Sequence, residues 1–217
     1  MSSTVKRVTA PKRTYDATRR REQAEQTRIR VLETARDLFI EKGYGRTTVA
    51  EIARGAGVSA ETVYATFRNK PTLLRHVWYT TFRGDDNDIR LLHRPEIEAV
   101  LAEPDLSARF RMHARVMAPV MRRFTPLLRA LEAAAAHESA AADMVAEFDD
   151  MRLDACQHFA RAAAATGRLG VSQAECVDVL YTALDGHLWH RLVAQRGWSD
   201  ESFANWLGKL LVDELVK

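Results

Sequence analysis

Apolar residues recur at intervals of three and four over most of this chain, which is the spacing of one face of an α-helix. The pattern is clear near the C-terminus, where Ser199 is placed to cap a helix that carries Trp206, Leu210 and Leu215. No segment after Leu74 alternates between apolar and polar residues as a strand does. The sequence therefore predicts an all-α protein.

Prolines, glycines and capping residues divide this pattern into about nine or ten helices. Pro119 is expected to kink or break one of them. Gly186 falls inside another, where glycine is unfavourable unless a second helix must approach closely. In the C-terminal part, helical stripes are expected over residues 96–102, 106–117, 127–137, 144–162, 172–192 and 199–215, with Pro119 following the second of them.

Residues 47–74 describe two short helices joined by a tight turn. Thr48 and Glu51 have the spacing of a capping box, in which each side chain binds the other residue's backbone N–H. Gly57 is expected to end the first helix, because the left-handed conformation there is cheapest without a Cβ. Ser59 can then cap the second helix, and a turn this short makes the two helices cross steeply.

The second helix, about residues 60–67, is expected to bury Val63 and Phe67 and to leave its small polar and aromatic residues outward. A helix of this kind is typical of proteins that read the DNA major groove. The compact residues Ala60, Thr62 and Ala65 suit base edges, while the Tyr64 hydroxyl and Lys70, in the first turn of the next helix, suit phosphate oxygens. The alternative is an ordinary helical hairpin whose outward residues are only solvated.

Charge is distributed unevenly along the chain, although the net charge is only +3. Residues 1–76 contain 16 lysines and arginines against 8 acidic residues, whereas residues 77–217 contain 16 against 21. A basic front part on a mildly acidic body indicates that the front part meets phosphate. We therefore expect a DNA-binding domain over residues 22–75 and a larger regulatory and dimerisation domain over residues 76–217.

The first 21 residues are basic and have no hydrophobic period, so we expect a disordered arm. Such an arm can enter the minor groove, which makes Arg19 and Arg20 candidate DNA contacts. The alternative is a solubilising tail without a binding role. The stretch is too polar for a signal peptide, and no apolar run approaches the ~18 residues that span a membrane, so we expect a cytoplasmic, nucleoid-associated protein.

The chemistry of catalysis is not indicated by any motif. Cys156 and Cys176 lack metal-ligand spacing and are most simply buried thiols in a reducing compartment. Ser/His/Asp arrangements and glycine-rich phosphate loops are also missing from the sequence. We therefore expect no catalytic residues, no metal and no cofactor.

The segment from Ile29 to Leu74 resembles the DNA-binding domain of the tetracycline-repressor (TetR) family of bacterial transcription regulators. The resemblance implies that Thr48, Thr62, Tyr64 and Lys70 contact DNA; with the residues above, the candidate set also includes Ser59 and Arg68. The matching motifs are Gly43-Tyr44, Thr47-Thr48-Val49, Ile52-Ala53, Ala56-Gly57-Val58-Ser59, Thr62-Val63-Tyr64, Phe67, Lys70 and Leu73-Leu74.

Apolar residues between Leu180 and Leu192 occupy more than one helical stripe. A four-helix dimer interface, with two helices from each subunit, would use such a surface. The resemblance implies the same homodimer, and it extends weakly to Gly167-Arg168-Leu169 and Arg196-Gly197-Trp198-Ser199. Burial of both helices within a monomer remains the alternative.

The resemblance also implies an effector pocket inside the helical body. Methionine and aromatic side chains suit an adaptable apolar pocket, and they suit an ordinary core equally well. No carboxylate cluster suggests a strongly cationic ligand, so a mostly apolar organic molecule is expected. The candidate residues are Phe110, His113, Met117, Met121, Phe124, Phe148, Met151 and Phe159.

These observations predict a homodimeric repressor that binds a near-palindromic operator on double-stranded DNA and is released by a small-molecule effector. A second hypothesis is a dimeric DNA-binding regulator or nucleoid-associated protein that needs no ligand. A third is an enzyme for small apolar molecules with an accessory DNA-binding domain, for which the sequence offers no catalytic motif.

Overall fold

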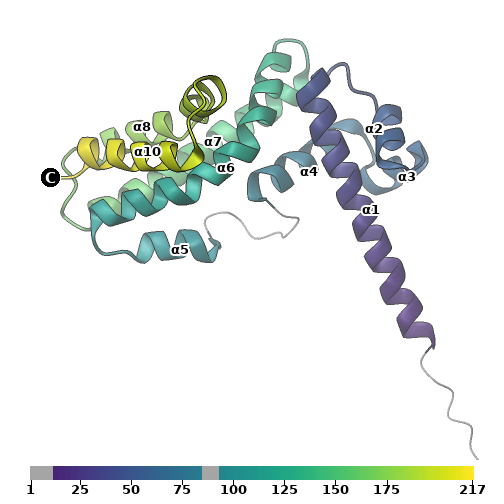
Figure 1. The fold of residues 1–217 in the computed structure, drawn as a ribbon, viewed down its shortest axis with the longest axis horizontal. Helices are drawn as coiled ribbons and strands as arrows, with labels where there is room; N and C mark the ends of the chain where they lie inside the picture. The colour runs from purple at the N-terminus through teal and green to yellow at the C-terminus, as the bar shows by residue number, and fades with distance from the viewer. Residues whose placement is uncertain (1–11, 85–92) are drawn as a thin grey trace, which may run out of the picture.

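The computed structural model describes residues 12–84 and 93–217, and these residues are almost entirely helical (Figure 1). The order is α1 (Lys12–Lys42), α2 (Val49–Ala56), α3 (Ala60–Phe67), α4 (Lys70–Arg83), α5 (Pro95–Ala102), α6 (Leu106–Ala135), α7 (Ser139–Ala164), α8 (Gln173–Ala183), α9 (His187–Trp189), the π-helical segment η2 (His190–Gln195) and α10 (Asp200–Leu215). The predicted all-α fold is confirmed for the described part of the chain.

The short helices α2 and α3 begin at the predicted capping residues. The Thr48 hydroxyl accepts from the Glu51 backbone N–H at 3.2 Å, and a Glu51 carboxylate oxygen accepts from the Thr48 N–H at 2.9 Å. The hydrogen bond from the Thr48 backbone, with another from Lys42 at 3.1 Å, lowers the pKa of Glu51 to about 2. The start of α2 is therefore fixed by local sequence.

A hydrophobic core joins the N-terminal helices to the middle of the chain. It contains Val31, Phe39, Ile52 and Phe67 from the first three helices, and it continues without a break into α6 and α7. The predicted boundary between residues 75 and 76 therefore crosses a continuous core. The residues that α4, α6 and α7 add are Leu73, Leu74, Val77, Trp78, Phe124, Leu127, Leu128, Leu131, Ala141, Met144 and Phe148.

Helix α6 is shared between this core and a second one. Its first half, with Leu106, Phe110 and Ala118, packs with α5, α7, α8 and α10 in the C-terminal core. At 30 residues and 1.5 Å per residue, α6 is about 45 Å long and connects the two ends of the molecule (Figure 1). The N-terminal helices thus pack at one end of α6, and the C-terminal core lies at its other end.

Three local expectations are corrected by the structure. Pro119 does not break its helix, because α6 runs through both Pro119 and Pro126. Gly186 is not within a helix: it has φ +88° between α8 and α9, and a Cβ there would lie 2.6 Å from the Thr125 hydroxyl oxygen. The expected helix over residues 172–192 is therefore interrupted, and its second part becomes π-helical.

The predicted disordered arm over residues 1–21 is wrong from Lys12 onward, since α1 begins there and projects beyond the N-terminal domain as a single helix of 31 residues (Figure 1). Residues 1–11 lie outside the described part of the chain. Arginine, glutamate and glutamine are good helix formers, so a helix can continue without an apolar stripe. Among the described residues, no helix is both long and apolar enough to cross a membrane.

Candidate nucleic-acid interface

The turn between α2 and α3 has the geometry that the sequence predicts. Gly57 takes φ +68° and ψ +37°, and the next backbone N–H, that of Val58, returns to the Ala53 carbonyl at 3.0 Å. The Ser59 hydroxyl then accepts from the Thr62 N–H at 3.2 Å and caps α3. Because both ends of the turn are capped, the direction of α3 relative to α2 is set by a backbone hydrogen bond and by the Ser59 side chain.

One face of α3 is buried and the other is open. Val63 and Phe67 are 2% and 1% exposed, whereas Tyr64 is 51% exposed. The other outward positions predicted from the sequence, Glu61, Thr62, Ala65 and Arg68, are also exposed, but Ala60 is half-buried against the N-terminal core. The structure thus presents most of the candidate base-reading residues on one open helix face.

The junction between α3 and α4 contains a strained residue. Arg68 has φ +63° and ψ −50°, and the Asn69 N–H donates to the Phe67 carbonyl at 2.7 Å, which closes a γ-turn around Arg68. The Asn69 side chain then accepts from the Thr72 N–H at 2.8 Å and caps α4. The strained turn allows α4 to begin immediately after α3, which places Lys70 next to the C-terminal end of α3.

Lys70 is held by the loop that follows α1. Its Nζ lies 4.1 Å from the centroid of the Tyr44 ring and donates to the Gly45 carbonyl at 3.4 Å. Burial lowers the pKa of Lys70, and the charge of Glu138 opposes that shift. Tyr44 is buried, and its pKa is raised to about 12 by burial and by Glu138. Sequence reasoning missed Tyr44 as a support for Lys70, although it stands within the Gly43-Tyr44-Gly45 motif.

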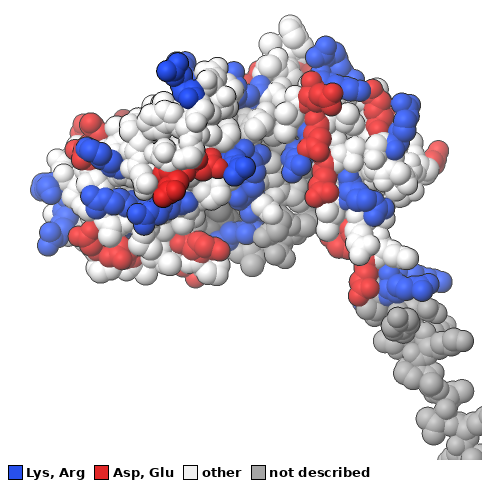
Figure 2. All heavy atoms as spheres, in the orientation of Figure 1, with Lys and Arg blue, Asp and Glu red and all other residues white. Residues whose placement is uncertain are grey.

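The remaining candidates lie apart from α3. Thr48 is exposed at the start of α2, and Arg19 and Arg20 are exposed on the projecting part of α1. Figure 2 shows lysine and arginine interspersed with acidic residues on the viewed face of the N-terminal domain, so this face is not uniformly basic. The ten candidate DNA contacts are therefore spread over α1, α2, α3 and the start of α4.

Comparison with known proteins identifies this domain. The sequence profile described as "Bacterial regulatory proteins, tetR family" matches residues 31–77. This N-terminal domain therefore belongs to the tetR family. Among its curated relatives is the HTH-type transcriptional regulator TtgR of Pseudomonas putida, which is 40% identical over 57 residues, or 26% of this chain and 27% of that protein. The chain thus matches about a quarter of the length of these relatives.

Solved structures of tetR-family proteins share the whole fold. NalD of Pseudomonas aeruginosa, the secondary repressor of the MexAB-OprM multidrug efflux pump, superposes with a TM-score of 0.63 at 22% identity and covers 90% of this chain and 98% of its own. SmeT in complex with triclosan has a TM-score of 0.65 at 20% identity, over 88% of this chain and 92% of its own. At these identities the similarity establishes the fold.

The eight candidate ligand-binding residues divide between the two cores. Phe124, Phe148 and Met151 belong to or pack against the N-terminal core. The others lie in the C-terminal part, with Phe110, Met121 and Phe159 buried, Met117 half-buried, and His113 stacked on Phe159 with ring centroids 4.1 Å apart. Most of these side chains are thus buried in one core or the other, and the ligand site remains a prediction.

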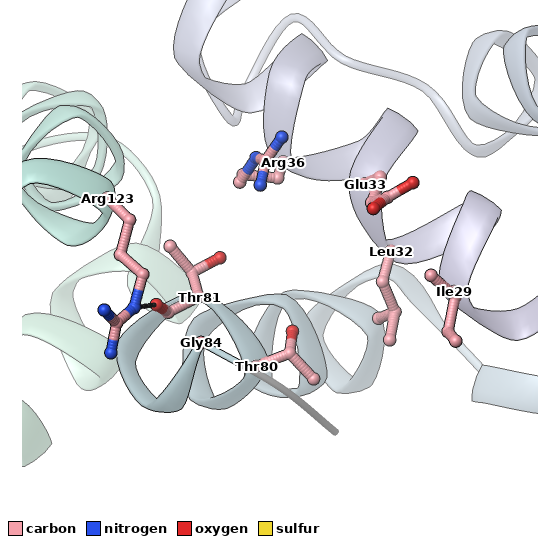
Figure 3. A pocket seen from close by; sticks show the side chains of 8 residues that line it. All are labelled: Ile29, Leu32, Glu33, Arg36, Thr80, Thr81, Gly84 and Arg123. Carbon is pink, nitrogen blue, oxygen red and sulfur yellow. Dashed lines mark hydrogen bonds between the residues drawn. The ribbon is translucent and has the colours of Figure 1, made fainter. Parts of the chain in front are cut away.

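Two hollows are lined by other residues. One, of about 270 Å³, lies between α1, α4 and α6 and is lined by Ile29, Leu32, Glu33, Arg36, Thr80, Thr81, Gly84 and Arg123 (Figure 3). The Arg123 guanidinium beside it donates to the carbonyls of Thr81, Phe82 and Arg83, at 3.0, 2.8 and 3.0 Å, and so caps the C-terminus of α4. The second hollow, of about 300 Å³, lies between the loop after α1 and the corner between α6 and α7. None of the eight candidate residues lines either hollow.

Replacement of Arg68 by glycine should separate stability from DNA affinity. Glycine has no Cβ and adopts a positive φ at little cost, so Arg68→Gly should raise the free energy of unfolding by up to about 1 kcal/mol. It should also weaken DNA binding and reduce the slope of log affinity against log salt by about 1, because a candidate phosphate contact is lost. Denaturant unfolding and anisotropy with labelled duplex DNA measure the two effects. Arg68→Gln, which keeps the strain and loses the charge, should weaken binding without the gain in stability; a glutamine variant more stable than the glycine variant would contradict this account.

His113 should make stability depend on pH. Burial lowers its pKa from 6.5 to about 4. Because the folded state holds the neutral ring, the stabilisation is complete above pH 6.5 and is lost as the pH falls from 6.5 towards 4. The pKa values imply a loss of about 2 kcal/mol between pH 7.5 and pH 5, measurable by urea unfolding. His113→Phe should lose this part of the pH dependence, while the exposed His158→Gln should keep it; equal pH dependence in wild type and His113→Phe would refute the assignment.

Proposed function

We propose that this chain is a DNA-binding transcriptional regulator, specifically a homodimeric repressor that a small, mostly apolar organic ligand releases from a near-palindromic operator. The observation that carries the proposal is the open face of α3, with Thr62, Tyr64 and Ala65 exposed and Val63 and Phe67 buried. This face lies in the domain that the tetR profile matches. A capped helix with one buried face is a rigid element for docking in a major groove.

In the proposed complex, Thr62 and Ala65 approach base edges, while Tyr64 and Lys70 contact phosphates on either side of them. Thr48, Ser59 and Arg68 lie at the ends of the two short helices, where they extend the phosphate contacts. Arg19 and Arg20 are exposed on the projecting part of α1, so we now assign them to a helical extension that reaches flanking DNA. Each phosphate that a basic side chain neutralises releases counterions, so the DNA affinity of an exposed helix increases with its positive charge.

The dimer is supported by apolar side chains in the C-terminal part of the chain. Trp198 is 36% exposed and its ring lies 6.1 Å from that of Trp206 in an edge-to-face arrangement. Leu188, Leu192 and Leu210 are only partly buried in the C-terminal core. A second copy that packs on this surface would place two recognition helices on one face of a DNA duplex, about 34 Å apart. Sedimentation equilibrium should then give about twice the chain mass of 24.5 kDa.

The ligand is supported by the character of the interior and by one unsatisfied atom. His113 Nδ1 is buried without a hydrogen-bond partner, and its ring stacks on Phe159 in a core that also contains the adaptable side chain of Met121. Among the solved relatives, SmeT forms a complex with triclosan, and NalD represses a multidrug efflux pump. By analogy, we propose that an apolar ligand separates side chains along α6 and moves α4 through its contacts with that helix.

Substitutions on α3 and α4 should separate two classes of DNA contact. Tyr64→Phe and Lys70→Gln should weaken binding to operator and to random duplexes by similar factors, since each removes a phosphate contact. Thr62→Ala and Ala65→Ser should instead change which sequences are preferred, with about 1–3 kcal/mol for each base contact altered. Selection from a random duplex library, followed by anisotropy, measures both. Identical sequence preference in all four variants would contradict the proposed position of α3.

An effector should act through α4. A ligand found by thermal-shift screening of apolar organic compounds should lower operator affinity about 5- to 150-fold, which corresponds to the usual coupling of 1–3 kcal/mol. The measurement is an operator titration at several ligand concentrations. Arg123→Gln, which weakens the cap on α4, should reduce this effect more than it reduces ligand affinity. A ligand that binds tightly and leaves operator affinity unchanged would exclude release by effector.

The alternative is a ligand-independent dimeric regulator or a nucleoid-associated protein. The observation in its favour is that the eight candidate ligand-binding residues are packed within the two cores and line neither hollow. The DNA affinity of such a protein should be the same with and without any small molecule. A failure of every screened compound to shift the melting temperature, together with strong duplex binding, would favour this alternative.

A further inference from the structure

The corner between α6 and α7 reaches the same loop that holds Lys70. Glu138, the residue before α7, does not use its side chain to cap that helix. Its carboxylate lies against Gly45 instead, so that a Cβ on Gly45 would be 2.6 Å from Glu138 Oε1. The Gly45 carbonyl is also the acceptor for Lys70 Nζ. One glycine therefore contacts both the ammonium group of Lys70 and a carboxylate from the body.

The two charges also influence each other electrostatically. Glu138 raises the pKa of Lys70 against the effect of burial, and it is the second cause of the raised pKa of Tyr44. Both shifts are in the direction expected of a negative charge nearby. Glu138 also lines the hollow between the two parts of the molecule, together with Lys42, Arg46 and His137. Solvent and ions therefore have access to this carboxylate, which weakens its field without removing it.

We propose that Glu138 is a positioning residue that lowers DNA affinity by holding a negative charge beside the phosphate-binding lysine. A phosphate bound to Lys70 is repelled by the nearby Glu138 carboxylate. The two negative groups also compete for the positive charge of the lysine. Because both side chains contact the same glycine, their separation is within the screening length of about 8–10 Å at physiological salt, and the bound phosphate feels the repulsion. This inference rests on the proposed function, because it takes Lys70 as a DNA contact.

Glu138 and Lys70 lie on different parts of the molecule, so their distance depends on how the body is arranged. Lys70 begins α4, whereas Glu138 belongs to the corner between α6 and α7. Any rearrangement of the body that moves this corner changes the charge beside Lys70 directly. DNA affinity then depends on the body through an electrostatic contact at the start of α4, in addition to the mechanical contacts along that helix.

The test is duplex binding by the full chain, with a labelled short fragment of random sequence, because a phosphate effect does not require the operator. Glu138→Gln keeps the shape of the side chain and removes its charge, so it should tighten binding roughly three- to ten-fold at low salt. The log–log salt dependence should become steeper, because Lys70 then neutralises phosphate more completely. Glu138→Ala should act in the same direction, and thermal unfolding checks that both variants fold.

Two controls make the result specific. Glu41→Gln removes an equal charge from an exposed position on α1, and it should change affinity less than Glu138→Gln does. In a Lys70→Gln background, Glu138→Gln should have almost no effect. Equal effects of Glu41→Gln and Glu138→Gln, or a full effect without Lys70, would overturn the inference while leaving DNA binding intact. A wild-type chain that binds no duplex at all would instead overturn the proposed function, and this inference with it.

Discussion

The contact between Trp78 and two phenylalanines from the body determines how the two ends of this molecule behave together. The Trp78 ring lies edge-to-face against Phe124 of α6 and Phe148 of α7, with centroids 4.4 and 5.4 Å apart. Phe82 completes the cluster at 5.1 Å from Phe124. Edge-to-face pairs add about 0.5–1.5 kcal/mol each beyond their buried area. Because Trp78 is fully buried, α4 cannot move away from the body without opening a cavity.

Polar contacts at two further points fix α4 against rotation. Arg75 donates to both carboxylate oxygens of Glu147 on α7, at 2.7 and 2.6 Å, and the Tyr79 hydroxyl donates to the same carboxylate. At its other end, α4 is capped by Arg123 from α6. Since α4 also begins at the lysine beside the recognition helix, a displacement of α6 or α7 reaches the DNA-facing surface through packed groups. This arrangement is a physical basis for coupling between the body and α3.

The sequence predicted the local structure of the N-terminal domain well, because its signals act over three or four residues. Thr48, Gly57 and Ser59 each form the cap or turn that their spacing indicates. Predictions failed where distant residues decide. Gly186 adopts its left-handed conformation beside Thr125, and no local pattern shows that contact. Gly45 and Glu138, which surround Lys70, stand 25 and 68 positions away in the sequence, so the environment of Lys70 could not be predicted from local spacing.

The two prolines of α6 flank the part of the helix that contacts α4. Pro119 and Pro126 donate no backbone hydrogen bond, so the carbonyls of Arg115 and Arg122 lack their helical partners, and each proline ring crowds the preceding turn. Between them lie Arg123, which caps α4, and Phe124, which packs on Trp78. This segment spans about two helical turns. A helix kinks most readily at proline, so a bend of α6 between its two cores would fall at the two ends of the segment that holds α4.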